Sequence, residues 1–588
     1  MSYRKITAVI VTALMLTSVL TACGTGGGGA TTTEAAAATT AATTAAAAAT
    51  TAASGGGSTS GDRQAPPEGK DTNNGRPYNL TLTAWDNRQE KYLNGINATI
   101  LPIVDEPLTI RIWLPFSSTV VTDVNDTEVF KAMGQRTNIL VEWMHPPQGQ
   151  NEDNFNLLVA SGDLPDVFCN PPAYPGGPAK AVDDEVYVDL TPYYTAGLMP
   201  NTKFLMESRT DLVRDYKDDE GRILSCKGID IVPTSPWSGL WVRSDWLEDL
   251  NLPEPKTIED WDTMLYAMQE AKVPNPLSFN LKDGQGVNTN FEFAGGYETG
   301  FEYINKNGKV EYGPINDGYL PFLTKMHQWY ADGIMDPDFA TRTWDDYLSN
   351  SINGVYGALG MAYGDVGPMM LGGTAKEPRY QLKPVLQPTT YDGQVIHLRQ
   401  GDELVRSSNT YMAYGAVDNG NDEIIARYLD YWYSQDGGDL FSMGVEGLSY
   451  EWNDEGTYTW IYPDLVNNAD ADFWTIMDRF KSHYIQTFLR DSAAYDNRPE
   501  VQECIDYWTT QLDDWRMPYG ITQTTEEARE LAELEADIKT YRDEMSYRFI
   551  MGQSPLSEYG AFVDQMKKLN IDRVIELKQA ALDRYFAR

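Results

Sequence analysis

The chain has 588 residues, of which 85 are acidic and 46 are basic, so its formal charge is −39. A field of this sign repels phosphates, which excludes nucleic acid as an expected partner. Once the low-complexity N-terminal part is set aside, about 480 residues remain to fold, enough for two large α/β lobes.

The N-terminus has the pattern of a secretory signal. Arg4 and Lys5 precede an uncharged run from Ile6 to Leu20, which is too short to span a bilayer comfortably. The residues Leu20-Thr21-Ala22-Cys23 resemble the lipobox of bacterial lipoproteins. This resemblance implies removal of residues 1–22 and lipidation of Cys23, and therefore a protein anchored at the extracellular face of the cell membrane. The alternative is a lone cysteine in an ordinary cleaved signal.

Residues 23–76 predict a flexible tether. The segment from Gly24 to Gly61 is almost wholly Gly, Ala, Thr and Ser, and so few large apolar groups cannot offset the entropy of ordering. A tether of about 40 residues has a root-mean-square reach of roughly 35 Å. The folded body would therefore work just above the membrane.

Cysteine and histidine positions predict neither a metal site nor a cofactor site. After Cys23 only Cys169, Cys226 and Cys504 remain, so one bridge or buried thiols are both open and a CxxC site is excluded. The four histidines show no HExxH spacing, and the chain has no GxSxG elbow and no Walker-type phosphate loop. We expect no required metal and no enzymatic activity.

The folded body opens with alternating strands and helices. Leu108 to Leu114 alternates as a strand, Thr127 begins a helix, and Asn138 to Met144 is a second strand. A helix around Phe155 to Ala160 and a buried strand through Phe168 follow. This order predicts a parallel sheet covered by helices, and ligands of such sheets lie at the carboxyl ends of the strands. Those ends carry Phe116 and Ser117, Pro146 to Gln148, and Asn170 to Tyr174.

Five stretches, in this order, resemble the family 1 extracellular solute-binding proteins of ABC importers. They are Ser161-Gly162-Asp163-Leu164-Pro165-Asp166, Trp241 to Leu252, Asn307 to Gly313, Trp329 to Thr341, and Phe549 to Tyr585. The resemblance implies an α/β, two-lobe periplasmic-binding-protein-like fold of type II. Each lobe would be a mainly parallel sheet flanked by helices, with a hinge between the lobes and a helical C-terminal extension.

The resemblance also implies where the chain passes between the lobes. Crossings are expected at Val232-Pro233, at Gln387-Pro388 and at Gly444 to Gly447. Lobe 1 would consist of residues 77–236 and 389–445, and lobe 2 of residues 237–388 and 446–588 with the helical tail. Several crossings of this kind make a hinge.

Patterns within the later segments predict individual elements. Thr257 begins a capped helix whose Trp261, Met264, Leu265 and Met268 form one apolar stripe, which we interpret as core. Tyr411 to Val417 is predicted as a strand and Glu423 to Tyr433 as a helix. From Phe473 the tail is predicted to be helical. Its residues from Leu531 to Met545 have a heptad-like spacing, which could indicate a coiled coil. Because the pattern lasts barely three heptads, we favour packing across the second lobe.

The composition suits a carbohydrate cleft, with 15 Trp and 35 Tyr in the chain. Sugar rings have apolar faces that stack on aromatic rings, and their hydroxyls need polar partners. The resemblance places seven candidate ligand-binding residues at strand ends and crossings: Phe116, Asn170, Tyr174, Trp237, Tyr363, Asp365 and Glu446. For each aromatic residue, half-buried packing is the alternative.

The sequence therefore predicts the capture subunit of an ABC importer for a sugar or oligosaccharide. It would be a monomer that works with permease subunits, and the ATPase would be a separate subunit. A peptide or other polar solute is the alternative ligand. A secreted glycoside hydrolase with two carboxylates and a surface adhesin are the alternatives from other classes.

Overall fold

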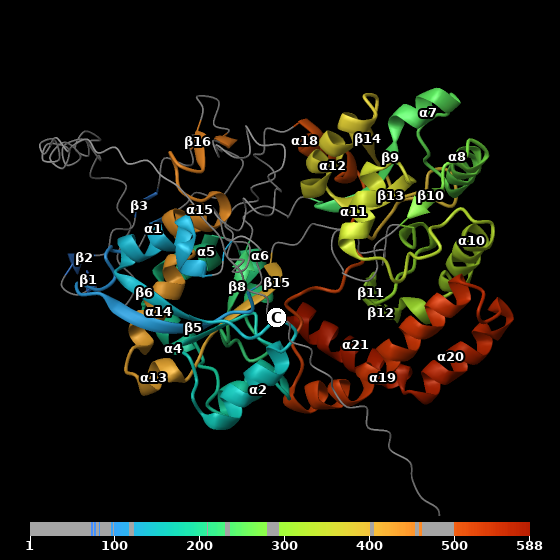
Figure 1. Ribbon diagram of the computed structural model, residues 1–588. Helices are drawn as coiled ribbons and strands as arrows, with labels where there is room; N and C mark the ends of the chain where they lie inside the picture. The colour runs from blue at the N-terminus through green and yellow to red at the C-terminus, as the bar shows by residue number, and fades with distance from the viewer. Residues whose placement is uncertain are drawn as a thin grey trace, which may run out of the picture. The chain divides into compact units, whose positions relative to one another are not determined.

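The computed structural model (Figure 1) describes residues 99–116, 121, 123–208, 210–229, 236–278, 293–399, 405–452, 458–460 and 499–588. It also describes four two-residue strands, β1 (Thr72–Asn73), β2 (Arg76–Pro77), β3 (Thr81–Leu82) and β4 (Ile96–Asn97). Outside the described residues lie Cys23, the predicted tether up to residue 71, the Val232-Pro233 crossing and the predicted helix from Phe473 to 498.

A five-stranded sheet organises the first lobe, in the order β6-β5-β7-β15-β8. Its strands are β5 (Leu108–Trp113), β6 (Ile139–Met144), β7 (Val167–Cys169), β8 (Cys226–Ile229) and β15 (Val405–Met412). The first three pair in parallel, whereas β15 runs antiparallel to both β7 and β8. The strand that enters late from a distant part of the chain therefore lies inside the sheet rather than at its edge.

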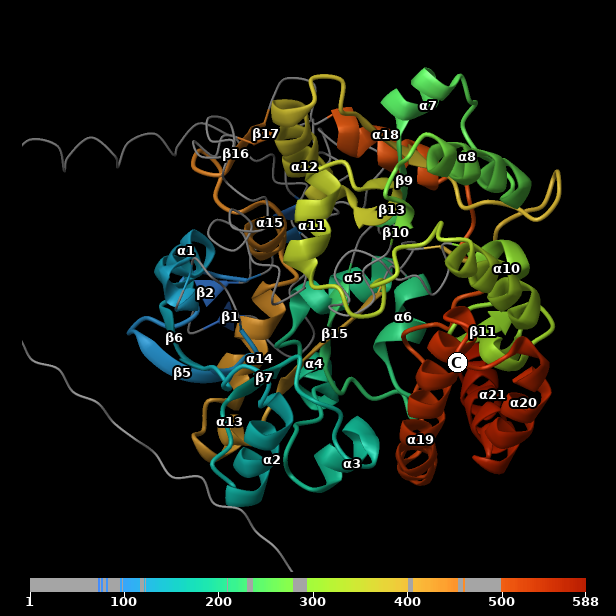
Figure 2. The ribbon, with the colours of Figure 1, turned by 45° about the vertical axis from the view of Figure 1, so that its right-hand side comes forward.

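Helices cover this sheet on both faces (Figures 1 and 2). They are α1 (Glu128–Thr137), α2 (Asn151–Ser161), α3 (Gly177–Asp183), α4 (Thr191–Thr195), α5 (Pro200–Ser208), α6 (Thr210–Tyr216), α13 (Gly415–Asp418), α14 (Asp422–Tyr431) and α15 (Gln435–Met443). Helix α1 begins as predicted, because the Thr127 hydroxyl accepts a hydrogen bond from the Phe130 amide. It ends at Asn138, which adopts a left-handed conformation with φ 58°.

The second lobe contains a four-stranded sheet in the order β10-β13-β9-β14. Its strands are β9 (Ser238–Arg243), β10 (Asn275–Ser278), β13 (Tyr356–Ala362) and β14 (Leu382–Val385). β10 and β13 pair in parallel, whereas β9 runs antiparallel to both β13 and β14, so three of the four strands point in the same direction. A short hairpin, β11 (Tyr303–Lys306) with β12 (Lys309–Tyr312), lies apart from it, as does the pair β16 (Tyr450–Trp452) and β17 (Tyr458–Trp460).

The helices of the second lobe include the C-terminal group. They are α7 (Ser244–Leu250), α8 (Ile258–Glu270), α10 (Tyr319–Ala331), α11 (Trp344–Ile352), α12 (Tyr363–Lys376), α18 (Pro499–Trp508), α19 (Thr525–Ile550), α20 (Tyr559–Lys568) and α21 (Ile571–Ala587). In Figures 1 and 2 the last three lie side by side. Short 3₁₀ turns occur at Val124–Asp126, Gly295–Tyr297, Gly313–Ile315 and Leu556–Glu558.

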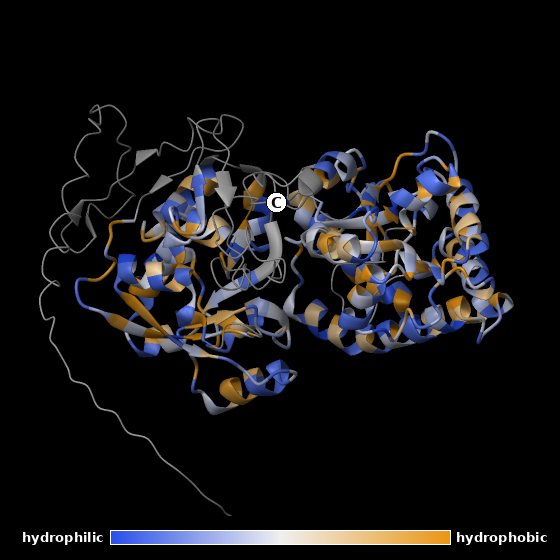
Figure 3. Cartoon of the chain, turned by 45° about the horizontal axis from the view of Figure 1, so that its top comes forward, coloured by the Kyte–Doolittle hydropathy of each residue, from blue (hydrophilic) through white to orange (hydrophobic). Residues whose placement is uncertain are grey.

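Each sheet has its own hydrophobic core. Ile110, Ile112 and Met133 are fully buried in the first, together with residues of α14 and α15. The second contains Trp261 and Leu265 of α8, so the predicted apolar stripe is confirmed as core. Figure 3 shows hydrophobic residues concentrated along the strands and on the inner faces of the helices.

The helical tail packs as predicted across the second lobe. Leu531, Ile538 and Met545 of α19 are buried in the same cluster as α8 and α10 rather than in a coiled-coil seam. A capping box starts this helix, in which the Thr524 side chain and the Glu527 side chain each bond the other residue's backbone amide.

One predicted element is wrong. The strand expected at Tyr411 to Val417 lies earlier, as β15, and residues Gly415–Asp418 form a short helix. A Cβ atom at Gly415 would lie 2.3 Å from the Pro165 carbonyl oxygen. Glycine is therefore required at this close approach, where the chain leaves the sheet.

The exact lobe boundaries stay a prediction. After β14, however, Thr389 donates its amide to the Lys256 carbonyl and Arg399 donates its amide to Asp513. Residues 389–399 therefore contact elements of the second lobe. These contacts favour a crossing after Arg399 over the predicted one at Gln387-Pro388.

Candidate functional site

The carboxyl ends of β5 and β6 carry a small aromatic cluster. Phe116 follows β5, and its ring stacks on the imidazole of His145, with centroids 4.9 Å apart and planes 30° apart. The Trp143 ring lies nearly parallel to the same imidazole, at 6.1 Å. His145 Nδ1 is 2.9 Å from the Leu114 carbonyl oxygen, which fixes the ring orientation. The parallel register of the two strands brings these rings together.

Asn170 ends β7 and is held by β15. Its backbone amide donates to the Asn409 carbonyl at 2.8 Å, and its side-chain Oδ1 accepts from the Asn409 amide at 3.0 Å. Asn170 adopts a left-handed conformation with φ 47°, which asparagine tolerates. The backbone amide and the side-chain oxygen of Asn170 are therefore both hydrogen-bonded to β15.

Tyr174 lies in the loop after β7 and is half-buried. Its hydroxyl donates to Asp184 at 2.9 Å. Desolvation and this carboxylate raise the pKa of Tyr174 to about 12, so the phenol is a neutral donor at physiological pH.

Three predicted residues meet at the start of β9 and the end of β13. The Trp237 carbonyl accepts a hydrogen bond from the Tyr363 amide at 3.0 Å, because Ser238 pairs with Ala362 in the sheet. Trp237 and Tyr363 are half-buried. Asp365 is 7% exposed and lies in the first turn of α12, where the helix dipole favours a carboxylate.

Glu446 is exposed and lies just after α15. It forms an isolated β-bridge with Tyr450. The structure thus brings Trp237, Tyr363 and Asp365 together in the second lobe, and it places Phe116 and Asn170 at neighbouring strand ends in the first.

A cavity of about 510 Å³ lies beside the first sheet, within the range of roughly 300 to 1,000 Å³ that small ligands occupy. Ser225, Lys227, Asn409 and Tyr411 line it from β8, β15 and the residue before β8. Tyr519 and residues 521–524 line it from the segment before α19, and Thr525 and Glu526 line it from the first turn of that helix. We call it the β15 pocket. None of the seven predicted residues lines it, although Asn409 bonds Asn170 directly.

The β15 pocket combines an aromatic ring with polar groups. Tyr411 stacks on Tyr187, with centroids 4.2 Å apart. Lys227 Nζ donates to the Asp215 carbonyl at 2.5 Å, and desolvation lowers the pKa of this lysine to about 8. In the sequence, Lys227 is visible only as an ionisable residue close to apolar ones. That signal does not point to a pocket without the pairing of β8 with β15.

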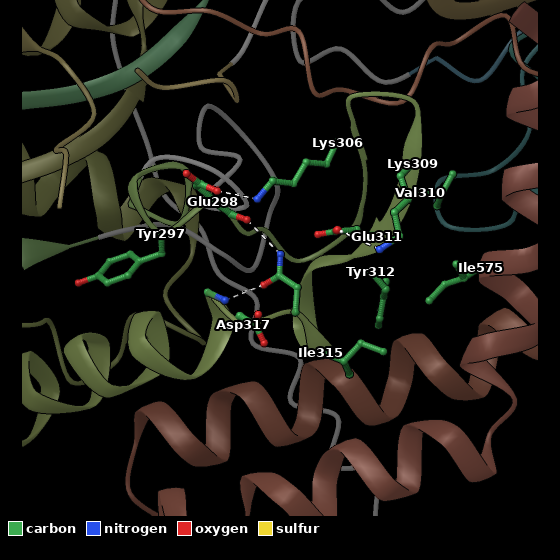
Figure 4. A pocket seen from close by; sticks show the side chains of 12 residues that line it. Tyr297, Glu298, Lys306, Lys309, Val310, Glu311, Tyr312, Ile315, Asp317 and Ile575 are labelled. Carbon is green, nitrogen blue, oxygen red and sulfur yellow. Dashed lines mark hydrogen bonds and ion pairs between the residues drawn. The ribbon is translucent and has the colours of Figure 1, made fainter. Parts of the chain in front are cut away.

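A second, more open cavity of about 630 Å³ lies against the hairpin of β11 and β12. Figure 4 shows Lys306 pointing toward Glu298, to which it donates a hydrogen bond. The Asn316 side chain donates to the Glu298 carbonyl and accepts from the Gly318 amide. The ion pair Lys306–Glu298, at 2.6 Å, neutralises both charges. This cavity contains none of the predicted site residues.

Among the described residues, no three His, Cys, Asp or Glu side chains are placed to hold a metal ion. Cys169, Cys226 and Cys504 are free and buried, so the buried-thiol alternative is correct. Desolvation raises the pKa of Cys169 and of Cys226 to about 12, which makes both thiols unreactive. Within the described part of the chain, no helix is long and apolar enough to cross a bilayer.

Comparison with known proteins identifies two relatives of low sequence identity. No family model matches the chain. The fructooligosaccharide ABC transporter substrate-binding protein FusA of Streptococcus pneumoniae is 21% identical over 517 residues, which are 82% of this chain and 92% of FusA. The lipoprotein LipO of Bacillus subtilis is 23% identical over 261 residues, 42% of this chain and 49% of LipO.

Solved structures show the same fold. The alginate-binding protein AlgQ2, determined without calcium ion, superposes with a TM-score of 0.68 at 22% identity, covering 82% of this chain and 99% of AlgQ2. FusA in complex with kestose gives a TM-score of 0.66 at 18% identity, covering 82% of this chain and all of FusA. The two-lobe, periplasmic-binding-protein-like fold predicted from the sequence is therefore confirmed.

Proposed function

We propose that this protein captures a sugar or oligosaccharide between its two lobes and delivers it to the permease of an ABC importer. One observation carries the proposal: the fold matches, over 82% of the chain, substrate-binding proteins whose names specify fructooligosaccharide and alginate. FusA is by name a substrate-binding protein of an ABC transporter, and we infer that this chain likewise binds its ligand without turning it over.

The proposed ligand site lies at the strand ends that face the cleft of such folds. Phe116 would stack on a sugar face, supported by the His145 ring behind it at 4.9 Å. Trp237 and Tyr363 would offer the opposing surface, because their backbones are joined at the start of β9 and the end of β13. Asn170, Tyr174, Asp365 and Glu446 would supply polar contacts to hydroxyls.

The groups that line the β15 pocket favour a polyhydroxylated ligand. It is bordered by a tyrosine ring, an asparagine, a serine and an amine, the mixture of apolar face and hydrogen-bonding groups that sugars require. A pocket for an apolar ligand would not place Lys227 at its wall. A peptide or other polar solute would also use such groups and remains the alternative ligand.

We infer that the two lobes move about the crossings between them. The proposed first lobe consists of residues 77–236 and 389–445, and the second of residues 237–388 and 446–588. The contacts of Arg399 with the second lobe favour a boundary after Arg399 rather than at 388. Closure would add contacts from the second lobe that the open state lacks, and this differential binding would drive the change.

Attachment to the membrane is proposed through Cys23. Its lipobox-like context and the lipoprotein relative LipO support a lipid anchor at the extracellular face. The tether would leave the body free to meet permease subunits as a monomer. Neither the glycoside hydrolase nor the adhesin alternative accounts for the relationship to transporter binding proteins.

Calorimetric titration with kestose, alginate oligosaccharides and tetra-alanine tests the proposal. We expect saturable binding of at least one saccharide, with the sugar recovered intact by chromatography. Binding of the peptide alone would favour the alternative ligand, and cleavage of the saccharide would favour the hydrolase.

A further inference from the structure

The last turn of α21 contacts the first lobe through a set of charged groups. Arg584 Nε lies 2.7 Å from Asp219 Oδ2, and Arg588 donates to Asp219 Oδ1 from Nε at 2.9 Å and from a terminal nitrogen at 2.5 Å. The Tyr585 hydroxyl donates to Asp215 at 2.8 Å. We call Asp215, Asp219, Arg584, Tyr585 and Arg588 the α21 clasp.

The two sides of the clasp belong to different hydrophobic cores. Leu212 and Tyr216 of α6, next to Asp215 and Asp219, are buried with the first sheet. Ile571, Val574 and Leu577 of α21 are buried with the second sheet. A movement of the lobes that separates α6 from α21 would therefore break these contacts.

Arg588 also strengthens the clasp by binding backbone carbonyls at the C-terminal end of α6. Its guanidinium donates to the carbonyls of Arg214 at 3.0 Å and Lys217 at 2.7 Å, which lie at the C-terminal end of that helix, and to the Gly520 carbonyl at 2.9 Å. Helix C-termini leave carbonyls without partners and favour cations. A single side chain thus joins α6, the segment before α19 and Asp219.

Glu527 keeps Arg584 in position. Two hydrogen bonds, at 2.9 and 2.5 Å, bind this guanidinium to the Glu527 carboxylate at the start of α19. Burial alone would raise the pKa of Asp219, but the guanidiniums of Arg584 and Arg588 lower it. The Asp219 side chain is 22% exposed and Arg588 only 10% exposed, so salt screens this cluster less than a pair on the open surface.

The clasp also borders the β15 pocket. Asp218, Asp219 and Glu220 line that pocket from one side, and Tyr519 with residues 521–526 from the other. At Gly520 an added Cβ would lie 2.4 Å from the Asp215 Cα atom, so the two walls meet here in direct backbone contact. Release of the clasp would separate these walls.

We propose that the α21 clasp is an electrostatic latch, which holds the C-terminal helices against the first lobe and must release for the β15 pocket to open. The inference rests on the proposed movement of the lobes. The latch can nevertheless be tested by a distance measurement without any ligand. Failure of the latch and failure of the proposed function can therefore be distinguished.

Distance measurement between two spin labels tests the latch in the full chain carrying Cys23→Ala. Leu157→Cys on α2 is 65% exposed in the parent, and Lys568→Cys on α20 is exposed. Because Cys169, Cys226 and Cys504 are buried, only the introduced thiols are labelled. The test variant is Asp219→Asn, which keeps the side-chain size and removes the charge.

The matched control is Glu530→Gln. Glu530 binds Arg573 at 2.8 and 3.0 Å, between α19 and the same helix α21, within one lobe. At an ionic strength of about 20 mM we expect a single short distance for the parent and for the control, and a longer distance in addition for Asp219→Asn. In about 500 mM salt the parent should shift toward the variant.

An unchanged distance in Asp219→Asn, or an equal shift in Glu530→Gln, would overturn the latch. Arg584→Gln should act like Asp219→Asn, and the double variant should add little, because both remove one interaction. A longer distance in Asp219→Asn, combined with no binding of any saccharide in the titrations above, would support the latch and reject the proposed function. Saccharide binding without a distance change would do the reverse.

Discussion

The Phe116 ring stacks on the His145 imidazole at the carboxyl ends of two adjacent parallel strands, with ring centroids 4.9 Å apart. His145 is in turn fixed by the Leu114 carbonyl and lies parallel to Trp143. An aromatic ring supported in this way loses little conformational freedom when a ligand stacks on it, which favours affinity.

Phe116→Ala should therefore weaken saccharide binding. Loss of one stacking surface costs about 1 to 3 kcal/mol by analogy with base stacking, or roughly 5- to 150-fold in affinity. Titration with whichever saccharide binds the parent measures this loss. Tyr391→Ala, at an aromatic side chain that is 59% exposed, serves as the control and should bind like the parent. Equal affinities of Phe116→Ala and the parent would remove Phe116 from the site.

Trp237 and Trp261 should respond differently to truncation. Trp237 is half-buried beside the second sheet, whereas Trp261 is fully buried and packs edge-on against Phe293 at 4.9 Å. We expect Trp237→Ala to reduce binding with little change in stability. Trp261→Ala should cost about 3 to 5 kcal/mol of unfolding free energy.

Thermal melts and titrations of both tryptophan variants decide the matter. If Trp237→Ala melts as low as Trp261→Ala, or binds like the parent, its role is packing and not stacking.

The buried Asp430 should make part of the stability depend on pH. Its carboxylate accepts bonds from the amides and side chains of Asn201 and Thr202 at 2.7 to 3.0 Å. Desolvation nevertheless raises the pKa of Asp430 to about 6. Because the folded-state pKa lies above the unfolded one, the stabilisation is complete below about pH 4 and is lost as pH rises through 6.

The Asp430→Asn variant has no carboxyl group to titrate at this position. The difference in unfolding free energy between parent and variant therefore isolates the contribution of Asp430 ionisation. Urea unfolding at pH 4, 5, 6 and 7 should show the parent losing roughly 3 kcal/mol relative to the variant across that range. A constant difference would mean that Asp430 titrates normally.

Cys23→Ala should release the protein from membranes without affecting the folded body. Two acyl chains anchor a protein stably, whereas one gives only marginal attachment. Fractionation after a salt wash measures the release, and circular dichroism confirms that the body is intact. Retention of the variant in the membrane fraction would contradict the lipid anchor.

Local patterns predicted much of the fold. Thr127 and Thr257 indicated helix starts because a hydroxyl cap is a short-range interaction. The buried stripe of α8 followed from its period alone. β15 was misplaced because its first half is polar, from Arg406 to Thr410, and its position depends on pairing with β7 and β8.

The candidate site was only partly predictable for the same reason. Phe116 and Asn170 follow strands that are visible in the sequence, so their positions could be inferred. Lys227 and Asn409 meet through a strand pairing between residues that are 182 positions apart. Neither residue stands out locally, and such long-range pairing cannot be read from periodicity.

Calorimetric titration followed by chromatography of the ligand tests whether the protein binds a saccharide and releases it unchanged. We predict saturable binding of kestose or an alginate oligosaccharide with one site per chain, weakened by Phe116→Ala, and full recovery of the intact sugar. No heat from any saccharide while tetra-alanine binds, or recovery of cleaved sugar, would contradict it.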